Sequence, residues 1–356
     1  MRAPLINFLS QVSIASSLLF IPVFAKEIGA SDIEVGIIAS TYSLSTFVAS
    51  SIFGRLSDFF NRKIILLSGL LLSSIFFFAQ CLVKTPAQLL VVRALVGFSI
   101  GIFPAALMSY AYEKNRNVGS FSAFGSLGWA FGQLIAGFIM FYQRIFAFGA
   151  FLFFLAFLMI LRERFPAQKI SRPRSSLTII RQNFSIYLAF FIRHVGASAV
   201  WLIFPIYLTE IGISKFWIGI IYFMNSFLQF IIMQRIERFN PQFLLNLGTV
   251  FSGLTFLLYS FATQAHEFLA IQPLIAIGWS AMYVGALRIV LENNLERNSA
   301  AGFLNSTIYL STILGSIIGG IIAENFGYKS CLYFGAILSF LALGSRIKNR
   351  KSLFGS

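Results

Sequence analysis

Long, continuously apolar segments separated by short polar connections restrict what this chain can fold into. Hydrophobic residues make up 58% of the 356 residues and charged residues only 11%, which leaves too little polar surface to cover a soluble globule of this size. A helix that crosses a bilayer needs roughly 20 residues, so about twelve crossings fit with short loops and no separate soluble domain. The runs do not alternate between apolar and polar residues, which favours helices over a β-barrel. The sequence therefore predicts an all-α integral membrane protein with twelve transmembrane helices.

The expected spans follow the apolar runs. They lie near residues 4–26, 32–53, 64–83, 87–111, 119–141, 145–161, 184–208, 215–234, 243–263, 268–291, 299–323 and 328–345.

The second half of the chain repeats the first. A shift of 183 residues lays residues 21–38 on residues 204–221 with eight of eighteen positions identical, and it pairs Pro22 with Pro205 and Gly29 with Gly212. One shift over most of a half indicates a duplicated unit of six spans. We therefore expect three parts: an N-terminal six-helix bundle, a basic linker and a C-terminal six-helix bundle, over residues 1–161, 162–183 and 184–356.

The net charge of +15 does not indicate a nucleic-acid partner, because the basic residues are dispersed among the loops. With the N-terminus in the cytoplasm, 20 Lys and Arg fall in the tails and in the loops on that side, five fall outside, and Arg93 and Arg193 lie within spans. This is the positive-inside bias, and it predicts a cell-membrane protein with both termini cytoplasmic. Span 1 follows Arg2 without a cleavage site of the usual kind, so we expect it to be retained.

A charged decapeptide, GRLSDFFNRK at residues 54–63, separates the second and third apolar runs and is expected to form a tight loop at the membrane surface. It resembles the loop G-x-L-[AS]-D-R-x-G-R-[RK] of the major facilitator superfamily. Phe59 stands at a position that is usually Arg, and Asn61 replaces a Gly, a mild change since Asn tolerates left-handed backbone. The matching residues are Gly54, Leu56, Asp58, Arg62 and Lys63.

This resemblance covers essentially the whole chain and implies the facilitator fold: two parallel six-helix bundles with a solute site at their interface near the bilayer midplane. It also implies that Gly54, Asp58, Arg62 and Lys63 form a conformational gate, with Asp58 near the N-terminal end of span 11. The copy of the loop in the second half, at residues 233–242, lacks the glycine.

Span 5 carries a run of glycines that resembles a motif of antiporter branches of the family, although Gln133 replaces its proline. Glycines at this spacing let another helix approach closely. Plain close packing and a seal that limits leakage in an exporter both remain open. The residues are Gly119, Gly128, Gly132 and Gly137.

Four polar residues deep in the spans are candidates for solute binding. Arg93 resembles the family's R-x-x-x-G element of span 4, which is associated with proton coupling; snorkelling to the interface is the alternative. Arg193 and His194 lie about 15 Å from the start of span 7, near the bilayer centre. Gln11, which the repeat pairs with His194, lies on a polar stripe of span 1. A structural role for the two span 7 residues also remains open.

All twelve acidic residues lie near span ends or in loops. The expected cavity is therefore positive, which favours an anionic or zwitterionic solute.

These features favour a secondary transporter that works by alternating access as a monomer, without a cofactor, and that contacts lipid. Proton-coupled export is the leading hypothesis, and an uptake permease or uniporter is the alternative within transport. An enzyme is not expected, because the chain has two histidines, no metal-ligand spacing and no nucleophile motif. A non-transporting membrane sensor on the same scaffold is the third hypothesis.

Overall fold

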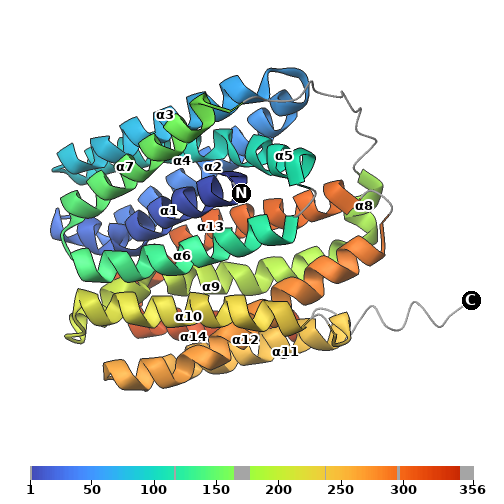
Figure 1. The fold of residues 1–356 in the computed structure, drawn as a ribbon. Coiled ribbons are helices and arrows are strands. Elements are labelled where there is room, and N and C mark those ends of the chain that lie inside the picture. The colour runs from blue at the N-terminus through green and yellow to red at the C-terminus, as the bar shows by residue number, and fades with distance from the viewer. Residues whose placement is uncertain (1, 116–117, 164–176, 237, 295–296, 345–356) are drawn as a thin grey trace, which may run out of the picture. The chain divides into compact units, whose positions relative to one another are not determined.

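The computed structural model describes residues 2–115, 118–163, 177–236, 238–294 and 297–344 (Figure 1). Within these residues the secondary structure is helical, and no strand occurs. The helices are α1 Arg2–Glu27, α2 Asp32–Phe59, α3 Arg62–Ala79, α4 Pro86–Ile102, α5 Pro104–Asn115, α6 Val118–Ile139, α7 Tyr142–Leu161, α8 Leu177–Gln182, α9 Phe184–Glu210, α10 Lys215–Ile236, α11 Pro241–Tyr259, α12 Ala265–Glu292, α13 Arg297–Phe326 and α14 Tyr328–Gly344, with a 3₁₀ turn, η1, at Gln80–Leu82.

The described helices confirm the predicted number of crossings. Ten helical stretches are long and apolar enough to span a bilayer, and Ala123–Ile139 and Tyr328–Leu343 are shorter apolar stretches. The fourth span, Pro86–Ala111, is divided into α4 and α5 at Phe103. Pro104 explains the division, because proline has no N–H to donate and disfavours a helical residue before it.

The chain divides into two compact units, one of residues 1–172 with 208–227 and the other of residues 173–207 with 228–356. In the first unit α1 packs against α6, α2 against α4 and α3 against α7. In the second unit α11 packs against both α12 and α14. The predicted bundle boundary at residues 162–183 stays a prediction.

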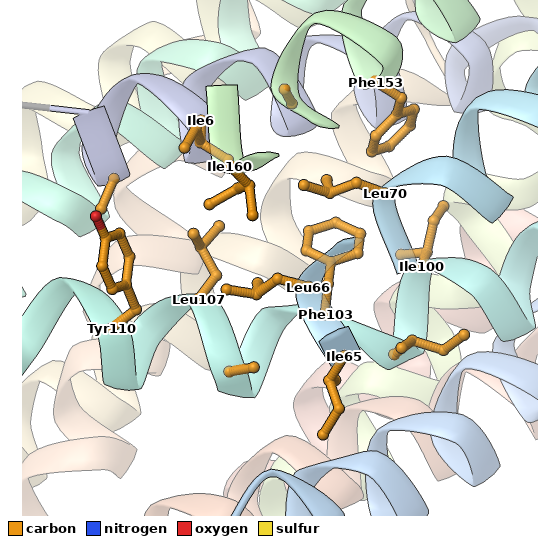
Figure 2. Packing of buried hydrophobic residues seen from close by; sticks show 14 of the residues in the cluster. Ile6, Ile65, Leu66, Leu70, Ile100, Phe103, Leu107, Tyr110, Phe153 and Ile160 are labelled. Carbon is orange, nitrogen blue, oxygen red and sulfur yellow. The ribbon is translucent and has the colours of Figure 1, made fainter. Parts of the chain in front are cut away.

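Large apolar side chains from α3, α5 and α7 fill the core of the first unit. Figure 2 shows Leu66 and Leu70 beside Phe103, Leu107 and Phe153. The rings of Phe103 and Phe153 meet edge to face, with centroids 6.0 Å apart. Such aromatic contacts add attraction beyond simple burial.

Helix contacts repeat between the halves with the shift read from the sequence. A Cβ atom added to Gly132 would lie 2.5 Å from the carbonyl oxygen of Val12, and one added to Gly315 would lie 2.4 Å from that of Val195. Both residues of the second contact follow those of the first by 183 positions. Spans 1 and 5 of one half and spans 7 and 11 of the other therefore approach in the same way.

The middle of each half follows a different shift. Added Cβ atoms place Gly69 against Phe103 and Gly248 against Met282, and these residues differ by 179 positions. Spans 9 and 10 are thus four residues closer to span 7 than a single shift predicts. Helix α10 has 22 residues against 28 in α2, so its C-terminal end is the shorter one.

The expected loop at residues 54–63 is wrong in its extent. Helix α2 continues through Asp58 to Phe59, and α3 already begins at Arg62. Asn61 does not use left-handed backbone, because its φ is −60°. It serves as the N-cap of α3, where its side-chain oxygen accepts from the Lys63 backbone N–H at 3.0 Å, one of the donors that a helix start leaves unpaired.

Gly132→Ala should destabilise the fold, because the new methyl group would press on backbone atoms of α1 that cannot move independently. We expect a loss of about 1 to 3 kcal/mol, the usual effect of overpacking. Thermal melting in detergent measures it. Gly302→Ala is the matched control, since nothing lies within 4 Å of its added Cβ in α13. Equal melting temperatures for the two variants would contradict the proposed close contact.

Candidate functional site

The charged residues between α2 and α3 tie helix ends together. The Lys63 ammonium donates to the carbonyl oxygens of Leu161 and Glu163, both at 2.9 Å, and so satisfies the C-terminal end of α7. Arg62 Nε donates to the carbonyl of Ser57 at 3.2 Å. A cation at a helix C-terminus is favourable because it meets the unpaired carbonyls. These two predicted gate residues therefore hold the junction of α2, α3 and α7.

The other two gate residues differ in what can be said of them. An added Cβ on Gly54 would meet only Ala105 of α5, at 4.0 Å, so the contact there is loose. The side chains of Asp58 and of residues 298–299 lie outside the part that the structure describes. The predicted approach of Asp58 to span 11 stays a prediction.

Arg93 is buried inside the first unit. Its side chain is 2% exposed, so it does not snorkel to the interface. Nη1 donates to Gln80 Oε1 at 3.3 Å, and the guanidinium carbon lies 4.0 Å from the centroid of the Tyr42 ring. Ser17 donates to the same Gln80 oxygen at 3.3 Å. Arg93 therefore links α4 to α1, α2 and the end of α3.

The second half has a neutral version of this pair. Gln272 Nε2 donates to the Tyr259 hydroxyl oxygen at 2.9 Å, and both residues are buried. They follow Arg93 and Gln80 by 179 positions, the shift that relates these spans. A long donor facing a short acceptor in one half thus corresponds to a short donor facing a long acceptor in the other. Joining spans 3 and 4 is the shared task, and the positive charge is peculiar to the first half.

Arg193 of α9 has no exposed surface. Its Nε and Nη2 donate to Ser252 Oγ at 3.1 and 2.7 Å, and Ser252 in turn donates to the Gly248 carbonyl at 2.6 Å. The guanidinium carbon lies 5.6 Å from the ring centroid of Trp279. Among the described residues no carboxylate pairs with Arg193, and its buried Nη1 has no hydrogen-bond partner. The charge is therefore held by one hydroxyl and aromatic faces alone.

His194 lies beside the same aromatic residues. Its ring centroid is 5.4 Å from that of Trp279 and 5.8 Å from that of Phe190. Nε2 is 3.5 Å from Thr312 Oγ1, and buried Nδ1 has no partner among the described residues. The structure thus brings Arg193, His194 and Trp279 together in the second unit.

Span 1 places its polar stripe against α6. Gln11 is half-buried, and its Cβ lies 3.0 Å from a Cβ added to Gly128. Asn7 donates to the Phe121 carbonyl at 2.9 Å, whereas the buried Ser10 hydroxyl has no partner among the described residues. Gln11 is thus close to helix α6, and its role toward a solute stays a prediction.

The span 5 glycines contact two different helices. Gly128 and Gly132 meet the backbone of α1, whereas a Cβ added to Gly137 would lie 2.8 Å from the Cα of Gly219 in α10. Gly119 belongs to α6, but its surroundings lie outside the described side chains. The glycine run therefore packs α6 between α1 and the first half of α10.

Gln133 joins the same two helices. Its amide nitrogen, in the orientation that satisfies its neighbours, donates to Ser226 Oγ at 2.6 Å and to the Tyr222 carbonyl at 2.9 Å. The amide oxygen accepts from Trp129 Nε1 at 3.1 Å. A residue that replaces the proline of the resembled motif thus supplies a polar bridge between α6 and α10.

An ion pair lies at the end of this contact. Lys215, the first residue of α10, pairs with Glu27 at 3.0 Å, and its ammonium lies 4.0 Å from the Tyr142 ring centroid. The Tyr142 hydroxyl also donates to Glu27. We call the contacts of residues 215–226 with α1, α6 and α7 the α10 seam. The seam extends from Lys215 to Ser226, about 16 Å along the helix.

Comparison with known proteins settles the family. The family model described as Major Facilitator Superfamily matches residues 5–293 and 186–351. The chain belongs to the Major Facilitator Superfamily.

Similar proteins agree with this assignment. The quinolone resistance protein NorA of Staphylococcus aureus strain COL is 24% identical over 339 residues, covering 85% of this chain and 83% of NorA. An uncharacterized MFS-type transporter of Methanocaldococcus jannaschii, MJ1560, is 22% identical over 345 residues, covering 90% of this chain and 89% of that protein.

Solved structures show the same fold. A crystal structure of a mutant of the nucleoside transporter NupG superposes with a TM-score of 0.84 at 13% identity and 98% coverage of both chains. An inward-facing, occupied bacterial homolog of the human lysosomal transporter Spinster gives 0.81 at 13% identity, covering 98% of this chain and 96% of that chain. The chain is therefore a multi-pass membrane transporter and not an enzyme. Its orientation and its oligomeric state stay predictions.

Sequence reasoning missed several partners in this facilitator. Ser252, Trp279 and Gln80 are ordinary residues in apolar spans, and nothing in their local pattern distinguishes them. The 179-residue shift could have found Gln80 and Tyr259 as equivalent positions, but one fixed shift of 183 concealed it.

In this facilitator, Arg93→Gln alone should destabilise the first unit, since the shorter side chain cannot reach Gln80. Adding Gln80→Tyr transplants the pair of the second half and should restore part of the loss. We expect a coupling of about 0.5 to 3 kcal/mol between the two positions. Melting temperatures of both single variants and the double variant measure it. Strictly additive effects would show that the two halves do not share this pair.

Proposed function

We propose that this facilitator is a secondary transporter that exports a small anionic or zwitterionic solute by alternating access, with Arg193 as the solute's main charged contact. One observation carries the proposal: Arg193 is fully buried, and its Nη1 has no hydrogen-bond partner among the described residues.

The surroundings of Arg193 support an anionic partner. Ser252 is neutral and accepts from two of the guanidinium nitrogens, so it leaves the charge uncompensated. A buried charge without a counter-ion is costly, and intramembrane charges of this kind mark solute or ion pathways. A carboxylate or phosphate on the solute would supply both the opposite charge and the missing acceptor.

The aromatic neighbours support a solute that also has a flat apolar part. Trp279 stacks on Tyr283 with centroids 5.7 Å apart, and His194 leans on Trp279. Aromatic faces suit rings and planar groups. NorA is named for quinolone resistance. Quinolones combine a ring system with a carboxylate, so they are the first compounds to test, and the name also supports export as the direction.

The α10 seam supports alternating access. Its ion pair is partly exposed, with 24% and 50% of the Lys215 and Glu27 side chains accessible, so breaking it costs little, about 0 to 1 kcal/mol. The contact of Gly137 with Gly219 involves no side chains that must disengage. A seam of this kind can close and open without a large barrier. We propose that it is the outer gate of the transporter.

Arg193→Gln should remove most solute binding. Quinolones and other aromatic carboxylates should raise the melting temperature of the wild type, because a ligand stabilises only the fold that binds it. Loss of a charge-assisted hydrogen bond of about 1.5 to 3 kcal/mol weakens binding roughly tenfold to hundredfold. Arg193→Lys should retain part of the affinity, since it keeps the charge but loses the planar fork.

Arg144→Gln is the control, because this exposed arginine lies at the start of α7 over Phe141. If well-folded Arg193→Gln binds a carboxylate ligand as tightly as the wild type, Arg193 is structural and the anionic solute is wrong. Flux into proteoliposomes with and without an imposed proton gradient then distinguishes a coupled exporter from an uptake permease or uniporter. Binding without any flux would favour the membrane sensor.

Glu27→Gln should open the outer gate more often. The reporter is Gln11→Cys in a background without Cys81 and Cys331, because Gln11 is expected to line the cavity. We expect faster labelling of this cysteine by a membrane-impermeant maleimide added outside, and the exchange Glu27→Lys with Lys215→Glu should reverse the effect. Glu292→Gln, which breaks the exposed Arg288 pair within α12, is the control. Unchanged labelling in Glu27→Gln would refute the gate.

A further inference from the structure

A groove of about 330 Å³ lies at one end of the second unit, where α10 ends and α11 begins. Its floor and walls are apolar, with buried Leu244 and Ile236 and the exposed rings of Phe239 and Phe243. The residues that line it are Ile231, Ile232, Arg235, Ile236, Arg238, Phe239, Phe243, Leu244, Leu247 and Ile277. Apart from the two arginines, every residue in this set is a hydrocarbon or phenyl side chain.

The two arginines line the end of the groove that the positive-inside rule assigns to the cytoplasm. Both are exposed, and among the described residues neither forms a hydrogen bond or an ion pair. The Arg238 guanidinium lies 5.0 Å from the centroid of the Phe239 ring. Arg288 differs, because it donates to the Phe239 carbonyl at 2.8 Å and pairs with Glu292. Arg288 thus fixes the turn, while Arg235 and Arg238 keep their donors for another partner.

The matching turn of the first half uses its cations internally. Lys63 donates to two carbonyls of α7, and Arg62 donates to Ser57. The altered copy at residues 233–242 has therefore lost this internal task. Its cations face outward at the membrane surface, above an apolar groove.

We propose that the groove is a binding site for an anionic phospholipid of the inner leaflet, with one acyl chain along Leu244 and Leu247 and the phosphate between Arg235 and Arg238. The charge of the arginines complements the phosphate, and arginine donates to phosphate through two parallel N–H groups. The apolar lining suits an acyl chain, which a soluble anion such as free phosphate would leave unused. Because lipid enters from within the bilayer, this site is separate from Arg193.

Native mass spectrometry of the purified full chain tests the site. The protein is incubated with phosphatidylglycerol or phosphatidylcholine that have the same acyl chains, and the bound lipid is counted. We expect phosphatidylglycerol to be retained in preference to phosphatidylcholine. Arg235→Gln with Arg238→Gln should weaken its binding about 30-fold, because each arginine near an anionic surface contributes about fivefold.

Arg162→Gln with Arg181→Gln is the matched control, since it removes two exposed cations that do not line the groove. It should leave phosphatidylglycerol binding unchanged. Leu247→Trp, which fills the groove and keeps both arginines, should reduce retention of phosphatidylglycerol. Equal retention of the two lipids by the wild type, or the same loss in both arginine pairs, would show diffuse surface attraction and overturn the site. Unchanged retention in a folded Leu247→Trp protein would place the acyl chain elsewhere.

Discussion

Close approach of helix backbones at glycine is the contact on which the rest of this structure depends. In a bilayer the hydrophobic effect does not draw helices together, because lipid tails are as apolar as the side chains. Attraction then comes from tight packing, and Gly132 and Gly315 bring their helices against carbonyl oxygens of α1 and α9. The same device in both halves shows that the duplication preserved backbone geometry more strictly than side chains.

The two buried arginines show how one scaffold supports different tasks. Arg93 lies among Gln80, Tyr42 and Ser17 and corresponds to a neutral glutamine in the second half. The joint between spans 3 and 4 therefore does not require charge. Arg193 has no such counterpart, because the repeat pairs it with Ser10. A charge that the architecture does not need, held by a single hydroxyl, is better suited to bind something than to hold the fold.

The α10 seam and the α10–α11 groove use opposite ends of one helix. At its start, Lys215 and Gly219 make small or partly exposed contacts with residues of the first unit. At its other end, Arg235 and Arg238 make no such contacts with described residues and face an apolar groove. A helix that is lightly held at one end and exposed to lipid at the other is suited to move during transport.

The sequence by itself determined the class, the number of spans, the repeat and the depth of Arg193, because hydrophobic length, charge placement and a fixed shift are visible in one dimension. It also marked Gly132 and Gly137 as packing residues. It misjudged the turn at residues 54–63, since the helical pairing of Gly54 to Phe59 depends on backbone hydrogen bonds that composition does not reveal. Only the tertiary structure decided the partners: Ser252 for Arg193, Gln80 for Arg93 and Ser226 for Gln133. These partners lie 59, 13 and 93 residues away, and packing between helices, not local pattern, brings them into contact.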